Sequence, residues 1–134
     1  MEKDQSRNIP VASSLYERVG GAQFFTTLVE RFYESVQKDP VLRPISPQDL
    51  EPGKAHLAAF LAQFFGGPQK YSEERGAPRL RMRHASFAIS QHVRDAWVQH
   101  MTATVEASEA SARDRAELNT YFEQTATFLM NRPG

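Results

Sequence analysis

The sequence contains no cysteine. This absence excludes disulfide bonds, thiolate zinc sites, cysteine-ligated iron–sulfur clusters and thiolate-ligated haem, and it also excludes covalent attachment of haem through a Cys-x-x-Cys-His motif. Any metal must therefore use histidine, carboxylate or other oxygen ligands, and any haem must be held non-covalently.

The sequence also lacks an excess of charge and a long apolar run. Its 16 basic residues balance its 16 acidic residues, so global electrostatics give no reason to expect nucleic acid or an anionic membrane as a partner. No apolar stretch approaches the roughly 18 residues of a membrane-spanning helix, and the polar residues 1–8 lack the apolar stretch of a secretory signal. We therefore expect a cytoplasmic protein that binds neither nucleic acid nor membranes.

The length of 134 residues fits one domain. Residues 1–12 are predicted to form a flexible N-terminal tail, and residues 13–134 are predicted to form the folded domain. Apolar residues recur there every three or four positions, and no strand pair or internal repeat is visible, so we predict an all-α fold. The first expected helix begins after Ser14, and the others cover about residues 21–37, 52–65, 79–85, 90–107 and 112–131.

Local signals at the ends of these segments support the expected boundaries. Ser14 and Glu17 have the spacing of a capping box. Pro52 suits the first turn of a helix, and Ser90 suits an N-cap. The segment 66–79 opens with Gly-Gly-Pro, which stops a helix, and shows no periodicity. It is therefore predicted to be a long loop, which in a small domain is usually functional or disordered.

The histidines are the first candidates for metal ligands. Alone, a histidine is more often a surface residue or a satisfied core residue than a ligand. His84 has a more favourable context, because in a short helix it shares one face with Leu80 and Phe87 at i, i+4 and i+7 spacing. The loop before it also leaves room for a bulky group. The other three histidines form no paired metal-binding spacing and are predicted to be structural, namely His56, His92 and His100.

Two polar aromatic residues lie on the inward faces of different expected helices. Tyr33 ends a stripe of phenylalanines, and its hydroxyl needs a partner if it is buried. Trp97, the only tryptophan, offers one N–H donor. Each is compatible with ordinary core packing. Together they are also compatible with a small polar site inside an apolar pocket.

A local basic cluster comprises Lys70, Arg75, Arg79, Arg81 and Arg83. Its simplest interpretation is a solvated face. A nucleic-acid surface is disfavoured, because the chain is neutral and no aromatic residues are interleaved to stack on bases. A third alternative is that some of these arginines pair with carboxylates of a ligand, which guanidinium groups bind well.

Several motifs, taken together, point to one family. They are Leu-Tyr-Glu-Arg-Val-Gly-Gly at 15–21, Arg-Phe-Tyr at 31–33, Phe-Phe-Gly-Gly-Pro at 64–68, Tyr-Ser-Glu-Glu-Arg-Gly at 71–76, Arg-Leu-Arg-Met-Arg-His at 79–84 and Arg-Asp-Ala-Trp at 94–97. With these motifs the sequence resembles the group II truncated haemoglobins of the globin superfamily, from about Ser14 to Asn131. The stretch from 66 to 97 stays in register over its whole length, which argues against chance similarity.

This resemblance implies a two-over-two helical sandwich around a non-covalent haem b, iron protoporphyrin IX. By the same resemblance, His84 matches the proximal iron ligand. Tyr33 and Trp97 match distal residues that donate hydrogen bonds to bound dioxygen. The further haem contacts that it implies are Leu57 and Phe60 on the distal face, Leu80 and Phe87 on the proximal wall, and Arg83, Tyr71 and Arg79 at the propionates.

The implied function is binding of dioxygen, nitric oxide or other diatomic ligands by a monomer or homodimer. Two charge-assisted hydrogen bonds of about 1.5–3 kcal/mol each slow dioxygen release by about two orders of magnitude or more, at roughly 1.4 kcal/mol per tenfold. Such a protein delivers oxygen poorly. We therefore expect nitric-oxide dioxygenation or peroxidase-like turnover with an external reductase. The alternatives are a non-enzymatic sensor of oxygen, nitric oxide or carbon monoxide, and a helical interaction module without a cofactor.

Two positions depart from the family pattern. Ser46 stands where these proteins often carry Tyr, Phe or His, so the distal donors are reduced to Tyr33 and Trp97 unless the serine hydroxyl acts through water. Gly53 stands at the place of the distal gate residue. The missing side chain there implies a direct path from solvent.

Overall fold

The computed structural model describes residues 13–133, so the predicted tail over residues 1–12 lies outside the described residues. Every regular element in the described range is helical, which confirms the all-α prediction. The elements are α3 (Leu15–Arg18), α4 (Ala22–Lys38), the 3-10 turn η1 (Arg43–Ile45), α5 (Glu51–Phe64), α6 (Lys70–Arg75), α7 (Leu80–Arg83), α8 (Gln91–Glu106) and α9 (Ala112–Phe128). None of these helices is long and apolar enough to cross a membrane.

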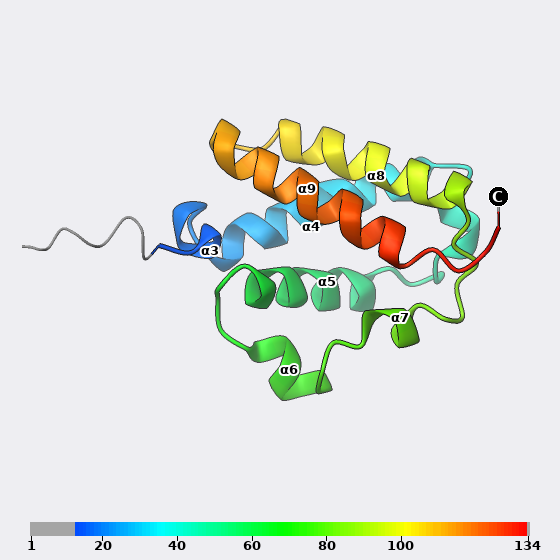
Figure 1. Ribbon diagram of the computed structural model, residues 1–134, viewed down its shortest axis with the longest axis horizontal. Coiled ribbons are helices and arrows are strands. Elements are labelled where there is room, and N and C mark those ends of the chain that lie inside the picture. The colour runs from blue at the N-terminus through cyan, green and yellow to red at the C-terminus, as the bar shows by residue number, and fades with distance from the viewer. Residues whose placement is uncertain (1–12, 134) are drawn as a thin grey trace, which may run out of the picture.

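The four long helices form two antiparallel pairs (Figure 1). Helices α4 and α5 make one pair, α8 and α9 make the other, and α4 also packs against α8. This arrangement is the two-over-two helical sandwich that the resemblance implied. The short helices α6 and α7 lie on the far side of α5 from α8 and α9 (Figure 1).

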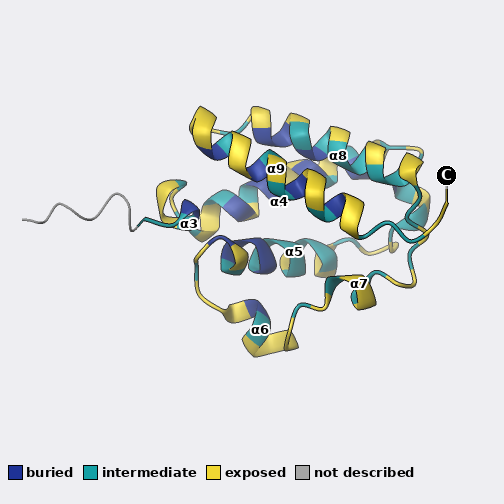
Figure 2. Cartoon of the chain, viewed as in Figure 1, coloured by how far each residue is buried: buried dark blue, intermediate teal, exposed yellow. Residues whose placement is uncertain are grey.

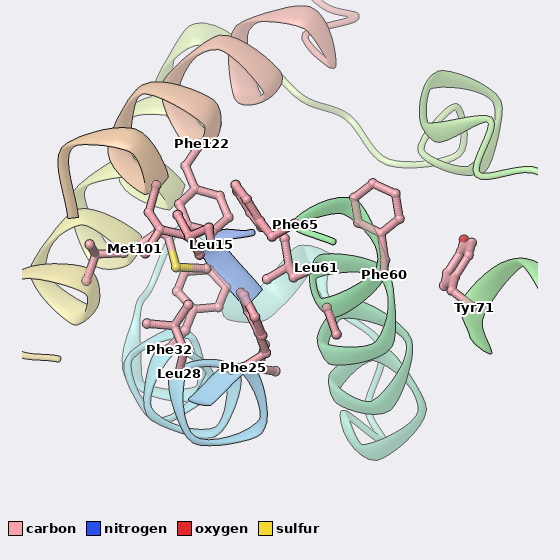
Figure 3. Packing of buried hydrophobic residues seen from close by; sticks show 14 of the residues in the cluster. Leu15, Phe25, Leu28, Phe32, Phe60, Leu61, Phe65, Tyr71, Met101 and Phe122 are labelled. Atoms are coloured by element: carbon pink, nitrogen blue, oxygen red, sulfur yellow. The ribbon is translucent and has the colours of Figure 1, made fainter. Parts of the chain in front are cut away.

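The core lies between the two pairs, where the buried faces of the long helices meet (Figure 2). Phe25 and Phe32 of α4, Leu61 of α5 and Phe122 of α9 point toward one another there (Figure 3). Each has at most 3% of its surface exposed. The stripe of apolar residues on α4 thus supplies the centre of the core, as expected from its three- and four-residue spacing.

The N-terminal turn is held by the predicted capping box. The Glu17 amide donates to the Ser14 hydroxyl at 3.1 Å, and the Ser14 amide donates to the Glu17 carboxylate at 3.2 Å. The stop at Gly66 and Gly67 has a second role, which is close packing against this turn. A Cβ on Gly67 would lie 2.5 Å from the ring of Tyr16, and a Cβ on Gly66 would overlap the side chain of Ser14.

The prediction of a long loop over residues 66–79 was wrong, because α6 forms within it. Contacts with α5 supply the stability that periodicity did not show. Tyr71 is buried and packs edge-on against Phe60, with ring centroids 5.4 Å apart. Ser72 and Gln63 exchange two hydrogen bonds of 2.7 and 2.9 Å. Tertiary contacts therefore decide the conformation of this segment.

The last helix is shorter than the sequence suggested. Helix α9 ends at Phe128, and the chain then leaves the helix axis instead of continuing to Asn131. The residues after it run beside the segment that connects α7 to α8, where the Asn131 amide donates to the Ile89 carbonyl at 2.9 Å. In Figure 1 this end is the thin red coil near the mark C.

Candidate functional site

A cavity of about 230 Å³ lies among the long helices, and most of its lining is apolar. Its walls come from α4, η1, α5, α8 and α9 and from the segment that contains α7. Seven of the residues that the resemblance assigns to the haem site line it, namely Tyr33, Leu57, Phe60, Leu80, His84, Phe87 and Trp97. Residues up to 64 positions apart in the chain therefore meet in one space.

His84 follows directly after α7 and lines the cavity. Its Nδ1 lies 2.7 Å from the carbonyl oxygen of Leu80. A carbonyl oxygen can only accept a hydrogen bond, so Nδ1 must carry the proton. In the neutral imidazole, Nε2 then holds the free lone pair, which is the arrangement that second-sphere carbonyls impose on metal-binding histidines.

His84 is not part of a side-chain cluster that could hold a metal ion within the described residues. Among residues 13–133, no three His, Asp or Glu side chains are grouped closely enough to hold one. A metal at His84 must therefore bring most of its ligands with it, as an iron porphyrin does.

Tyr33 lines the cavity from α4. Its ring packs edge-on against Phe32, with centroids 5.5 Å apart, which restrains its direction. Burial raises the pKa of the Tyr33 hydroxyl above its ordinary value, although the nearby ammonium of Lys54 opposes this shift. The hydroxyl is therefore protonated at neutral pH and acts as a hydrogen-bond donor.

Trp97 of α8 lies against the same phenylalanine. The Phe32 and Trp97 ring centroids are 5.0 Å apart, and the ring centroid of Phe122 of α9 lies 5.7 Å from that of Trp97. Phe32 thus touches both polar aromatic residues. Within the described part of the chain, neither the Tyr33 hydroxyl nor the Trp97 N–H has a hydrogen-bond partner in the protein, so both donors are available to a ligand.

Ser46 also lines the cavity, but its hydroxyl is engaged. It donates to the carbonyl oxygen of Leu42 at 2.8 Å. The serine proton is therefore directed at the backbone rather than at a ligand. This leaves Tyr33 and Trp97 as the donors that the sequence had suggested for this space.

The turn that carries Ser46 is held by a pair of residues that the sequence did not single out together. Asp39 accepts hydrogen bonds from the amides of Val41 and Leu42 at 2.7 and 2.9 Å. Its other carboxylate oxygen lies 2.6 Å from Nε2 of His100 on α8. The histidine predicted to be structural thus ties α8 to one wall of the cavity.

Gly53 lies in the first turns of α5 but outside the cavity wall. A Cβ on Gly53 would lie 3.1 Å from the hydroxyl oxygen of Tyr33. The missing side chain at Gly53 therefore makes room for the Tyr33 hydroxyl. A direct path from solvent at Gly53 stays a prediction.

The structure does not bring Tyr71 and Arg83 to the cavity wall. The Tyr71 ring faces Phe60 from α6 (Figure 3). The Arg83 guanidinium donates to the carbonyls of Pro78 and Arg75, each at 2.7 Å. In this structure both residues fasten the segment between α6 and α7, so a contact with propionates remains a prediction for them and for the exposed Arg79.

Comparisons with known proteins agree with this fold. Residues 14–131 match the model of the bacterial-like globin family. The chain is 37% identical over 128 residues to the group 2 truncated hemoglobin YjbI of Bacillus subtilis, covering 96% of this chain and 92% of that protein.

Solved structures give the same result. The hemoglobin of the thermophilic phototrophic bacterium Chloroflexus aurantiacus has 48% identity and a TM-score of 0.87, over 90% of this chain and 99% of that one. A truncated oxygen-avid haemoglobin from Bacillus subtilis has 36% identity and a TM-score of 0.84, over 89% and 100%. The chain therefore belongs to the bacterial-like globin family and, within it, to the group II truncated haemoglobins.

Proposed function

We propose that the cavity holds a non-covalent haem b, that His84 would be its proximal iron ligand, and that the haem would bind diatomic ligands. Membership of the globin family implies haem-based ligand binding. The observation that carries the assignment of His84 is its Nδ1–H bond of 2.7 Å to the Leu80 carbonyl oxygen. In the neutral ring, this bond leaves Nε2 without a proton, so its lone pair is free to bind iron in a cavity that is otherwise mostly apolar.

The residues present fit such a group. Haem supplies an iron atom with an open position for a diatomic ligand, and the protein tunes it through polarity, donors and access. The mostly apolar walls of the cavity favour a flat hydrophobic cofactor over an ion. Tyr33 and Trp97 then provide O–H and N–H donors without losing any hydrogen bond to the protein.

The pair of donors supports redox chemistry on dioxygen rather than oxygen delivery. Each charge-assisted hydrogen bond contributes about 1.5–3 kcal/mol, so two of them slow dioxygen release by about two orders of magnitude or more. One similar protein, from Bacillus subtilis, is itself described as oxygen-avid. We therefore propose nitric-oxide dioxygenation or peroxidase-like turnover, with electrons supplied by an external reductase.

The cofactor is tested by adding haem to the purified protein and to its His84→Ala variant. The wild type should develop an intense Soret band, and the variant should lose that band or show an altered one. His92→Ala is the matched control, because His92 is exposed on α8 and should leave the spectrum unchanged. A wild type that stays colourless, or a variant with an unaltered spectrum, contradicts the assignment.

The redox function is tested by steady-state consumption of nitric oxide by the oxygenated protein with an excess of reductant. An enzyme should complete many turnovers per haem. Binding with a single turnover, under conditions that keep the haem reduced, would instead support the alternative of a non-enzymatic sensor.

A further inference from the structure

Asn131 is tied to the segment that carries His84. Its side-chain Nδ2 donates to the carbonyl oxygens of Phe87 at 2.9 Å and of His84 at 3.3 Å. Its Oδ1 accepts from the amide of Ile89 at 2.9 Å. The backbone amide of Asn131 adds a bond to the Ile89 carbonyl at 2.9 Å. Because an amide N–H must meet an oxygen, these partners also settle which end of the Asn131 side chain is which.

The segment between α7 and α8 has little else to hold its backbone. Helix α7 has only four residues and no side-chain N-cap, and so short a helix is not stable by itself. Within the segment, the Phe87 amide donates to the His84 carbonyl at 3.0 Å. The Phe87 carbonyl and the Ile89 amide find their partners on the Asn131 side chain. The Ile89 carbonyl accepts from the backbone amides of both Asn131 and Arg132, at 2.9 and 3.2 Å.

This segment forms one wall of the cavity. His84, Phe87 and Ile89 all line it. The Leu80 carbonyl orients the His84 ring from the N-terminal side, and Asn131 holds the His84 backbone from the C-terminal side. In Figure 1 the two segments lie together near the end marked C. A shift of this backbone therefore moves the imidazole and the apolar wall beside it.

We propose that Asn131 is a positioning residue for the haem site, which sets the direction of the His84 imidazole and slows the loss of haem. The proposal rests on the proposed function of His84 as the proximal ligand. Asn131 is not among the residues that line the cavity, so it acts through the backbone of residues 84–89.

The first test is the Asn131→Ala variant of the haem-loaded protein. It removes every side-chain hydrogen bond of Asn131 and leaves the backbone bond to Ile89 in place. With several bonds lost, each with a modest net contribution, we expect haem transfer to an excess of a high-affinity acceptor apoprotein to become at least tenfold faster. The iron–histidine stretching band of the ferrous, ligand-free protein should also shift or broaden in resonance Raman spectra.

A second variant, Asn131→Asp, keeps the size of the side chain and its acceptor for the Ile89 amide. It places a carboxylate oxygen against the carbonyl oxygens of His84 and Phe87. We expect haem release at least as fast as in Asn131→Ala. This variant also keeps the proposal testable if the alanine variant fails to fold.

Ser111→Ala is the matched control. Ser111 caps the opposite end of α9 by accepting from the Asp114 amide at 3.1 Å, and loss of such a cap lowers stability by about 1 kcal/mol. The control should unfold at lower denaturant concentration but keep the wild-type haem release and iron–histidine band. An Asn131→Ala protein that matches Ser111→Ala in both readouts shows a merely structural role and overturns the proposal.

Failure of the underlying assignment is separately visible. If the wild-type spectrum is unchanged in His84→Ala, then His84 is not the ligand, and both the proposed function and this inference fall. If the spectrum depends on His84 but haem release does not depend on Asn131, only the inference falls.

Discussion

Gly53 of α5 lies beside Tyr33 of α4, and a Cβ on the glycine would lie 3.1 Å from the tyrosine hydroxyl oxygen. That distance is shorter than a comfortable carbon–oxygen contact, so a methyl group there must push the ring or the helix by a few tenths of an ångström. The absence of a side chain at residue 53 is therefore part of how the donor is placed.

The Gly53→Ala variant should accordingly change ligand kinetics more than stability. Alanine favours a helix over glycine by about 1 kcal/mol, which offsets the close contact with Tyr33. We expect dioxygen to dissociate severalfold faster while the denaturant midpoint changes little. Ala55→Gly, at an exposed position of the same helix, should lower stability and leave dissociation unchanged. Equal dissociation rates in Gly53→Ala and wild type would show that Gly53 does not place the hydroxyl.

Tyr33→Phe tests the donor itself. The variant keeps the ring that packs on Phe32 but removes the hydroxyl, and dioxygen should leave at least tenfold faster because a charge-assisted bond contributes about 1.5–3 kcal/mol. Stopped-flow displacement of dioxygen by carbon monoxide measures the rate. Tyr16→Phe, which alters a tyrosine outside the cavity wall, is the control. An unchanged rate in Tyr33→Phe removes the role assigned to that hydroxyl.

Ser46→Ala should have a small effect on the same rate. The serine hydroxyl donates to the Leu42 carbonyl at 2.8 Å and so has no proton left for a ligand. We expect dioxygen dissociation to change less than about twofold, because only a partly exposed local hydrogen bond is lost. A tenfold change would mean that the serine leaves Leu42 and reaches the ligand.

The pair of Asp39 and His100 predicts a pH-dependent contribution to stability. The hydrogen bond from His100, and then those from the amides of Leu42 and Val41, hold the pKa of the Asp39 carboxyl below its ordinary value. A carboxyl whose pKa is lowered in the folded state stabilises the fold above its unfolded pKa, and that stability is lost as the pH falls through the folded pKa.

We therefore expect Asp39→Asn to lower the free energy of unfolding by about 1 kcal/mol at neutral pH. The difference from wild type should shrink as the pH falls below 3.8, the ordinary value. Denaturant unfolding of both proteins across this range measures it. Glu109→Gln, at an exposed position, should show neither effect. A difference between Asp39→Asn and wild type that does not vary with pH would contradict the role of the ionised carboxylate.

The long helices were predictable because apolar residues recur every three or four positions along each of them. The stripe on α4 and the N-cap of α8 at Ser90, which accepts from the Val93 amide at 3.3 Å, appear where the sequence suggested. Helix α6 was missed because its stability comes from contacts of Tyr71 and Ser72 with α5. The six residues of α6 are too few to show a periodicity that would predict such contacts.

The residues of the candidate site also fall into those that were predicted from the sequence and those that were not. Motif resemblance singled out His84, Tyr33 and Trp97, and the structure brings all three to one cavity. The residues that hold its walls were not foreseen, because their partners are distant in the chain. Asp39 lies 61 residues from His100, and Asn131 lies 42 residues from Ile89.

The sequence by itself determined that this protein is all-helical and which residues form its apolar faces, because the spacing of apolar residues decides which sides of each helix avoid water. It also determined that a metal has no thiolate to bind, because there is no cysteine. Only the tertiary structure decided which hydrogen bonds are already satisfied. It directs the Ser46 proton to Leu42 and places Asn131 behind His84. Those pairings depend on where separate segments meet in space, which local spacing does not encode.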